Sequence, residues 1–193
     1  YFDGYADFLE RFLETLGVPR VAIYLHDFGS QIGLRLAIKR PDLIAALVIQ
    51  NGDIYEDQLG PKYEPLRQAL RLPPQEARAV LGKAVSLEGF QEEFLNDVRP
   101  ALAQCITPDL WHLHWSFMTP ERRRIATDVQ AGLKENFAWF PRYQAWLREH
   151  KPRTLIVWGP QDGYMPEGAA GAYLRDLPDA EQHLLDGGQW LLE

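Results

Sequence analysis

The feature that most constrains the fold is a strand, a sharp turn and a helix in direct succession at residues 21–33. Residues 21–25 form a continuous apolar run that contains valine, isoleucine and tyrosine, which is typical of a buried strand. Gly29 and Gly33 then open an apolar helical pattern. This is the context in which a nucleophile elbow lifts one side chain above the end of a sheet, provided that small residues allow the turn.

Two side chains in this turn are candidates for the nucleophile. Ser30 needs small residues two positions to either side, but Phe28 and Ile32 stand there. Asp27 fits better because Gly29 follows it by two positions. A carboxylate is ionised at neutral pH and attacks an electrophilic carbon without a base to deprotonate it first. The pattern leaves one alternative open, an ordinary loop in which the Asp27 side chain caps the helix.

The composition narrows the classes of protein to consider. The 193 residues are 46% hydrophobic and carry a formal charge of -7, so we expect one soluble globular unit and no nucleic acid partner. The dense basic run at residues 122–124 is typical of a solvated helix face. No apolar segment is long enough to cross a bilayer, so no membrane partner is expected. The single cysteine, Cys105, excludes an internal disulfide and makes the cytoplasm the expected compartment.

The order of the predicted elements indicates an α/β fold. A helical pattern at residues 5–16 precedes the elbow, and a second apolar strand follows at residues 44–49. Strand, helix and strand in that order imply a parallel pair with a right-handed crossover. The alternation resumes later, with strands at residues 154–158 and 183–185 around a helix at residues 168–177.

Between these parts lies a long segment without a strand-like run. Residues 53–150 carry long polar helical patterns punctuated by prolines, which predict a helical insertion. We therefore expect a mostly parallel sheet with flanking helices and a helical cap. The predicted divisions are a first part of the hydrolase-like core at residues 1–52, the cap at residues 53–150 and a second part of the core at residues 151–193.

Three motifs follow predicted strands and carry a family resemblance. Residues 26–30, His-Asp-Phe-Gly-Ser, are similar to a His-Asp-Trp-Gly-Gly elbow, and residues 158–162, Trp-Gly-Pro-Gln-Asp, are similar to an acid loop. Residues 186–190, Asp-Gly-Gly-Gln-Trp, are similar to a segment that bears a catalytic histidine. The chain thus resembles the α/β-hydrolase superfamily, specifically its aspartate-nucleophile branch of epoxide hydrolases and haloalkane dehalogenases.

This resemblance implies a role for each motif. Asp27 attacks a saturated carbon of a small apolar substrate to form an alkyl-enzyme ester, and the Phe28 N–H serves the oxyanion hole. Asp162 orients a histidine, and that histidine activates the water that hydrolyses the ester. Gln189 stands where the histidine is expected, and an amide has no usable basicity. We therefore expect ester formation to survive and ester hydrolysis to fail. No cofactor and no metal are implied.

The resemblance also implies segments that are not in this sequence. In the superfamily, further strands precede the elbow, and a loop after one of them supplies the second oxyanion donor. A helix follows the histidine segment. Because these N-terminal strands and this C-terminal helix are missing from the chain, we interpret it as part of a longer protein.

The five histidines are candidates to replace the missing base. His183 is nearest in sequence, yet six extended residues span up to about 20 Å. His112 and His114 lie on different faces of a predicted helix, which argues against a metal pair. His150 precedes the third strand, at the end of the sheet away from the elbow. His26 belongs to the turn, where we expect a structural role.

The leaving group separates the two kinds of substrate. A departing halide needs N–H donors, often an indole, whereas an opening epoxide needs an acid. Phe28, next to the nucleophile, has no side-chain donor, which favours an epoxide. The predicted cap offers as acids Tyr55, Tyr63 and Tyr143, and as indoles Trp111, Trp115, Trp139 and Trp146.

Three alternatives to an epoxide hydrolase stay open. The first is a haloalkane dehalogenase, which the indoles of the cap would serve. The second is a non-catalytic protein that uses a lidded pocket as a ligand receptor. The third, an ester or C–C bond hydrolase, is less consistent with the motif because such enzymes usually carry serine at the elbow.

Overall fold

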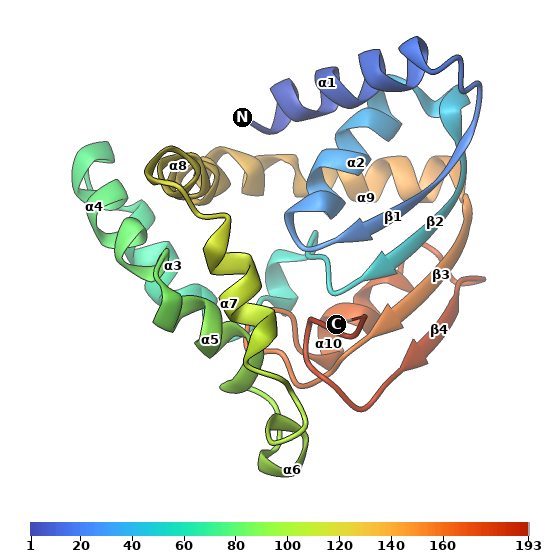
Figure 1. The fold of residues 1–193 in the computed structure, drawn as a ribbon. Helices are drawn as coiled ribbons and strands as arrows, with labels where there is room; N and C mark the ends of the chain where they lie inside the picture. Colours follow the sequence, from blue (N-terminus) through green and yellow to red (C-terminus); the bar gives the residue numbers. More distant parts are fainter. Residues whose placement is uncertain (193) are drawn as a thin grey trace.

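The structure, a computed structural model, describes residues 1–192. Four parallel strands form one sheet in the order β1-β2-β3-β4 (Figure 1). All four predicted strands are confirmed, although the fourth begins two residues earlier than predicted. The strands are β1 (Val21–His26), β2 (Ile44–Gln50), β3 (Arg153–Trp158) and β4 (Glu181–Leu184).

The expected α/β architecture with flanking helices is confirmed. The helices around the sheet are α1 (Phe2–Thr15), α2 (Phe28–Lys39), α9 (Phe140–His150) and α10 (Glu167–Tyr173). Between β2 and α9 the described chain is helical, with α3 (Tyr63–Leu70), α4 (Pro74–Ala84), α5 (Leu87–Leu95), α6 (Pro100–Ala103), α7 (Asp109–Ser116) and α8 (Pro120–Asn136). Short 3-10 turns lie at η1 (Pro41–Leu43), η2 (Glu56–Gln58) and η3 (Phe137–Trp139).

One face of the sheet forms the main hydrophobic core. Leu25, Ile49 and Ile156 point to this face and pack in one buried cluster with side chains of α2, α9 and α10. On the opposite face Tyr24 is 46% exposed. The prediction of a buried first strand is therefore right for one face and wrong for the other, because successive strand residues point to opposite sides.

The six helices α3 to α8, here called the helical region, lie beyond the arrowheads of the strands (Figure 1). A second cluster joins this region to α1, with Tyr63, Leu81 and Leu133 packing against Phe2. The α9 helix instead belongs to the main core cluster. The predicted division of the chain at residues 52 and 150 stays a prediction.

All four strands end at the edge of the sheet that faces the helical region (Figure 1). In open parallel sheets, ligands bind beyond this carboxyl edge. Asp27 directly follows β1, Asn51 follows β2, Asp162 lies in the loop after β3 and Gln189 lies in the loop after β4. None of the helices within residues 1–192 combines the length and apolar character needed to cross a membrane.

Candidate active site

Asp27 occupies a strained turn between β1 and α2. Its backbone has φ 48° and ψ -130°, a region that non-glycine residues rarely adopt. The Asp27 N–H donates to the Asn51 carbonyl at 3.0 Å, and the Ser30 N–H donates to the Asp27 carbonyl at 3.0 Å. The Asp27 side chain makes no capping hydrogen bond to α2. The sharp turn is thus confirmed, and the alternative of an ordinary helix cap is wrong.

The close packing of this turn depends on glycines other than Gly29. A Cβ atom at Gly33 would lie 2.3 Å from Leu25 Cδ2, and one at Gly52 would lie 1.7 Å from Ser30 Oγ. A Cβ atom at Gly29 would meet no atom within 4 Å among the described residues. The expectation that Gly29 provides the needed space is therefore wrong. Gly33 lets α2 approach β1, and Gly52 accommodates the buried Ser30.

Asp162 is buried and held by three hydrogen bonds. Its Oδ1 accepts from the backbone N–H groups of Tyr164 at 2.8 Å and Met165 at 3.0 Å. Its Oδ2 accepts from Asn51 Nδ2 at 2.9 Å. Burial raises the pKa of Asp162, and the hydrogen bond from Asn51 opposes that shift. Sequence reasoning missed Asn51, although a polar residue directly after a strand at the carboxyl edge was a usable signal.

The loop that carries Gln189 is docked against the acid loop. The Gln189 carbonyl accepts from Gln50 Nε2 at 2.7 Å and from His26 Nε2–H at 3.0 Å. The Gln161 N–H donates to the Gly187 carbonyl at 2.9 Å. The backbone at position 189 is therefore tied to the ends of β1 and β2, and its buried side chain lines a cavity together with Asp27. The structural role expected for His26 agrees with this contact.

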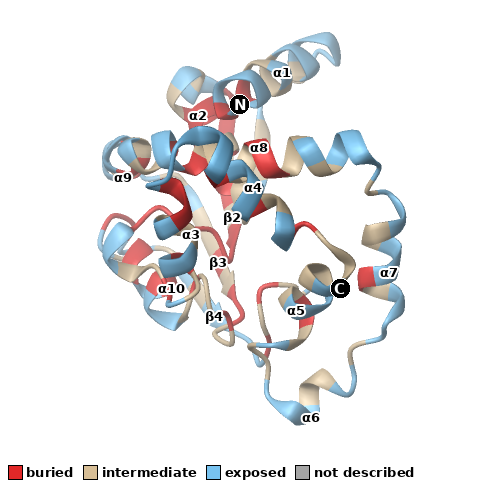
Figure 2. Ribbon diagram, turned by 90° about the vertical axis from the view of Figure 1, so that its left-hand side faces the viewer, coloured by how far each residue is buried: buried red, intermediate tan, exposed pale blue. Residues whose placement is uncertain are grey.

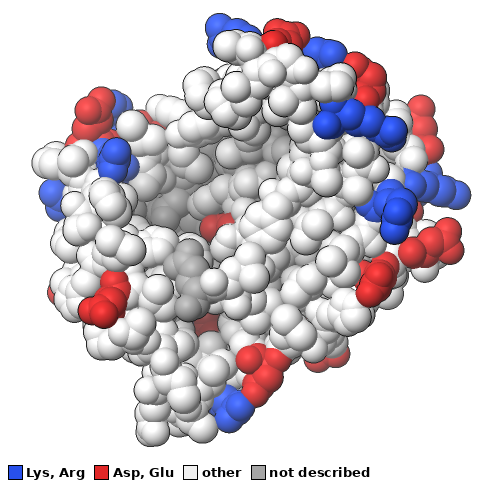
Figure 3. Space-filling model, turned by 45° about the vertical axis from the view of Figure 1, so that its right-hand side comes forward, with Lys and Arg blue, Asp and Glu red and all other residues white. Residues whose placement is uncertain are grey.

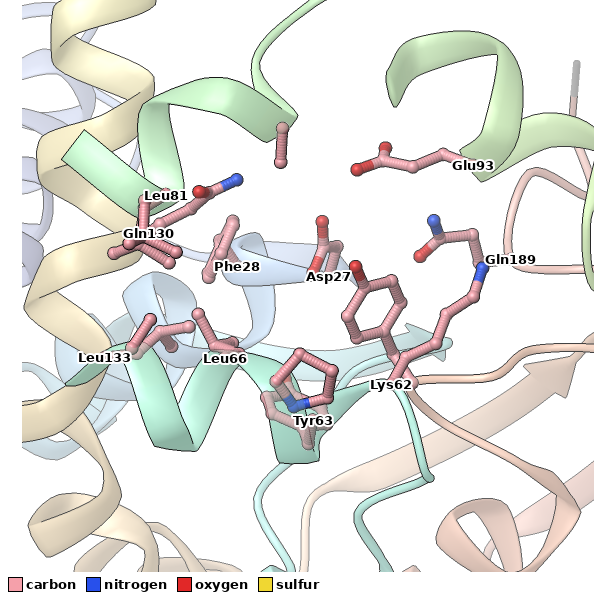
Figure 4. A pocket seen from close by; sticks show the side chains of 15 residues that line it. Asp27, Phe28, Lys62, Tyr63, Leu66, Leu81, Glu93, Gln130, Leu133 and Gln189 are labelled. Carbon is pink, nitrogen blue, oxygen red and sulfur yellow. The ribbon is translucent and has the colours of Figure 1, made fainter. Parts of the chain in front are cut away.

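This cavity has a volume of about 200 Å³ and an apolar wall. The wall comes from α3, α4 and α8, with Leu66, Leu81 and Leu133 (Figure 4). Figure 3 shows a hollow in one face of the molecule with an acidic side chain in its depth. The polar side chains that line the cavity are those of Asp27, Lys62, Tyr63, Glu93, Gln130, Tyr164 and Gln189.

Three carboxyl groups raise the pKa of Asp27. Burial is the largest cause of the upward shift, followed by the charges of Glu93, Asp53 and Asp162, while a hydrogen bond from the Phe28 N–H lowers the pKa. These causes favour the neutral form of Asp27, and the expectation that this carboxyl group is ionised at neutral pH stays a prediction. Burial also raises the pKa of Asp53 to about 6 and that of Glu93 to about 7. Carboxyl groups that interact in this way share protons.

Most of the predicted acids lie outside the cavity. The Tyr55 hydroxyl donates to Asp176 at 2.7 Å, and the Tyr143 hydroxyl donates to Asn136 at 2.9 Å. Tyr63 lines the cavity, but its hydroxyl donates to Asp53. Tyr164, which sequence reasoning missed, lines the cavity beside it, with the two rings 5.6 Å apart.

None of the candidate indoles lines the cavity within residues 1–192. Trp111 and Trp115 belong to α7, Trp139 stacks on Arg142 and Trp146 stacks on His150. Among the described residues, the side-chain donors that line the cavity around Asp27 are therefore amide, hydroxyl and ammonium groups. Within residues 1–192, the indole donor expected for a departing halide is therefore not in the lining of this cavity.

The histidines also lie outside the cavity in the described chain. His183 pairs with Glu181 at 2.7 Å on β4, and His150 stacks on Trp146 at the end of α9. His112 and His114 belong to α7, where the His114 ring lies 5.7 Å from the Phe94 ring. No cluster of three or more His, Cys, Asp or Glu side chains within residues 1–192 is placed to hold a metal ion.

Comparison with known proteins places the chain among hydrolases. A family model described as "alpha/beta hydrolase fold" matches residues 1–193. An uncharacterized hydrolase of Saccharomyces cerevisiae is 30% identical over 203 residues, which cover 100% of this chain and 67% of the relative. A 2-hydroxy-6-oxononadienedioate/2-hydroxy-6-oxononatrienedioate hydrolase of Paraburkholderia phymatum is 24% identical over 189 residues, which cover 94% of this chain and 60% of that protein.

Solved structures show the same fold. The crystal structure of a putative ancestral haloalkane dehalogenase matches with a TM-score of 0.73 at 19% identity. The match covers 98% of this chain and 68% of that structure. The chain therefore spans between 60% and 68% of the length of these three proteins.

Proposed function

The chain belongs to the α/β-hydrolase fold family, and we propose that it acts on a small apolar epoxide through an ester between the substrate and Asp27. The observation that carries the proposal is a carboxyl side chain on the strained turn after β1, which lines a cavity that also has an apolar wall. A nucleophile at such a turn stands clear of its own helix and reaches a ligand in the cavity.

The neighbouring groups support ester formation at Asp27. The Phe28 N–H lowers the pKa of Asp27, so it stabilises negative charge on this carboxyl group. The apolar wall excludes water and binds the hydrocarbon part of a substrate. Attack forms a bond from the carboxylate oxygen to a ring carbon of the epoxide and breaks the bond from that carbon to the ring oxygen.

The second step, hydrolysis of this ester, lacks its usual base at position 189. By family resemblance, Asp162 orients the residue at position 189, and a histidine there takes a proton from water. Gln189 holds a water by hydrogen bonds but takes no proton near neutral pH. We therefore expect the ester to be longer-lived than in a protein with histidine at this position.

A haloalkane substrate is the second candidate. A halide leaves without a proton and needs N–H donors, which Lys62, Gln130 and Gln189 offer in the cavity. The missing indole makes us prefer the epoxide. A receptor without catalysis is the third reading, and it differs from both in predicting no covalent chemistry at Asp27.

Intact mass spectrometry of the full-length protein tests the proposal. Acid-quenched samples with excess hexene oxide should show one added substrate mass, mapped to a peptide with Asp27. Asp27→Asn should abolish the adduct on the same timescale, because the amide is not a nucleophile. Modification at Cys105 instead would indicate nonspecific alkylation, and the absence of any adduct across epoxides and bromides would support the receptor.

A further inference from the structure

Glu93 is the one carboxyl group that reaches the Asp27 cavity from the helical region within residues 1–192. It lies on α5, and in Figure 4 its carboxyl group points toward the space above Asp27, near the Gln189 amide. Within residues 1–192, no hydrogen bond from another side chain contributes to the pKa of Glu93, which depends on burial and nearby charges. The Glu93 carboxyl group is therefore available to a ligand.

A second cavity adjoins the first at Glu93. This second cavity has a volume of about 260 Å³, and it shares Glu93 and Gln189 with the cavity around Asp27. Its far side includes Asp186, which is exposed and pairs with Arg99. Glu93 is itself only partly buried. Water and protons thus have a route to Glu93 that does not pass through the apolar wall.

We propose that Glu93 is the general acid and base that replaces the missing histidine, an inference that rests on the proposed function of Asp27. One carboxyl group attacks and a second, on the opposite side of the substrate, handles protons. The same division of labour between two carboxyl groups operates in retaining glycosidases.

Ester formation and ester hydrolysis together neither consume nor release a proton. At the start the Asp27 and Glu93 pair holds one proton, which is on Glu93, and Asp27 is ionised. As Asp27 attacks the epoxide carbon, Glu93 delivers this proton to the ring oxygen, which leaves an ester with a neighbouring hydroxyl group and an ionised Glu93. Glu93 then takes a proton from water, and the resulting hydroxide attacks the Asp27 carbonyl carbon. The bond from that carbon to the alkyl oxygen breaks, Glu93 protonates the leaving oxygen, and the proton of the hydroxide oxygen is left on Asp27. This proton then moves from Asp27 to Glu93, which restores the starting state.

The surroundings of Glu93 suit both roles. Burial raises its pKa to about 7, and the charges of Lys62 and His114 oppose the shift while that of Asp162 adds to it. An acid and base with a pKa near the working pH transfers protons most effectively in both directions. The titratable or charged side chains that face Glu93 from other elements are those of Asp27, Lys62, Tyr63, His114, Asp162, Tyr164 and Asp186.

Two alkylating probes separate the two roles in the full-length protein. The ring oxygen of hexene oxide needs a proton when its bond to carbon breaks, whereas the bromide of bromohexane leaves without one. In Glu93→Gln, we expect Asp27 to be alkylated by hexene oxide about 10 to 100 times more slowly, and release of either ester to slow by about 10²-fold or more. Alkylation by bromohexane should be unchanged or faster, because loss of the Glu93 charge eases ionisation of Asp27.

The matched control is Glu92→Gln, one position earlier on the same helix and exposed to solvent. It should leave all rates within about twofold. In the unaltered protein, ester release should rise with pH through the pKa of Glu93, and this rise should vanish in Glu93→Gln. A structural role for Glu93 would not remove a single titration while preserving alkylation by the bromide.

Each other outcome counts against the proposal in a different way. Ester release at the unaltered rate in Glu93→Gln, with Asp27 still alkylated, would overturn the role of Glu93 and leave the role of Asp27 standing. Slow release in His114→Gln with normal release in Glu93→Gln would assign the base to His114. If no probe alkylates Asp27 in the unaltered protein, the proposed function fails first and the role of Glu93 falls with it.

Discussion

The two sides of the cavity are built in different ways. On the sheet side, Asp162 and Gln189 follow strand ends, and hydrogen bonds hold their loops: three reach the Asp162 carboxylate and two reach the Gln189 carbonyl. On the helical side, Glu93 has no such bonds in the described chain and is placed by the packing of α5 against α7. The sheet edge thus fixes positions through hydrogen bonds at the strand ends, whereas the helical region does so through helix packing.

Burial differs between the two regions as well. In Figure 2, buried residues concentrate in β2, β3 and α2, while α6 and α7 are largely exposed or intermediate. The α7 helix has one buried residue, Trp111, and carries the exposed Leu113. Elements with few buried apolar contacts open locally at a lower free energy than core strands. The helical side of the cavity is thus the more adaptable side.

The largest change in the rate of ester release should come from placing a base at position 189, on the sheet side of the cavity. In the Glu93→Gln background, Gln189→His should speed ester release by about 10²–10⁴-fold, because a general base near neutral pH contributes that much. The decay of the Asp27 adduct measures this rate. Gln130→His is the matched control, since it places a histidine on the helical side of the same cavity. An equal acceleration by Gln130→His would show that the hydrogen-bonded position of residue 189 is unimportant.

Truncation of a side chain to alanine should lower the free energy of unfolding more in the main core than in the helical region. Ile156→Ala removes a fully buried side chain of β3 and should lower the free energy of unfolding by about 2–5 kcal/mol. Leu113→Ala on α7 should change it by less than about 0.5 kcal/mol, because Leu113 is 56% exposed. Denaturant titration measures both. A comparable loss for Leu113→Ala would show that another part of the full-length protein covers α7.

Asp53 bridges the two regions and should make stability depend on pH. Its carboxyl group accepts from Gln31 on α2 at 2.6 Å and from Tyr63 on α3. Its pKa rises from 3.8 to about 6, so between these values the folded state binds more protons than the unfolded state. The free energy of unfolding therefore falls as pH rises through this window, by about 3 kcal/mol for Asp53.

Asp53→Asn should remove that contribution, with the Asn oxygen accepting from Gln31 and the Asn amide nitrogen donating to the Tyr63 oxygen. Thermal or denaturant unfolding between about pH 4 and 6 measures the slope of the free energy of unfolding against pH. Asp42→Asn is the control, because that carboxyl group is exposed and pairs with Arg40 at the surface. An unchanged slope in Asp53→Asn would assign the pH dependence to Asp27 and Glu93 instead.

The last and smallest of these predicted changes is a gain in the free energy of unfolding on replacing Gly29. Because a Cβ atom there meets no atom within 4 Å in residues 1–192, Gly29→Ala should stabilise the protein by about 0.4–1 kcal/mol through the lower entropy of the unfolded chain. Gly33→Ala should instead destabilise it, since its Cβ atom would lie 2.3 Å from Leu25 Cδ2. A loss of stability in Gly29→Ala would indicate that a segment of the full-length protein packs over the turn.

Local sequence patterns determined the sheet side of this protein. Continuous apolar runs predicted the strands and the turn pattern after β1 predicted Asp27, while the family resemblance of the motifs after β3 and β4 predicted the loops with Asp162 and Gln189. The reason is that parallel strands bring their carboxyl ends to one edge, so position along a strand translates directly into position in space. The prediction missed Asn51 only because no motif drew attention to the end of β2.

Tertiary structure alone decided which residues of the helical region line the cavity and in which direction the pKa of Asp27 shifts. No pattern distinguished Glu93 from its neighbours on α5, and Tyr55 and Tyr143 were expected near a substrate but donate to buried partners elsewhere. A helix pattern specifies which face is buried, but the residue that reaches a given cavity depends on the angles at which several helices pack. The pKa of Asp27 likewise depends on burial and on the charges of Glu93, Asp53 and Asp162. These groups are distant in sequence and meet only in the folded chain.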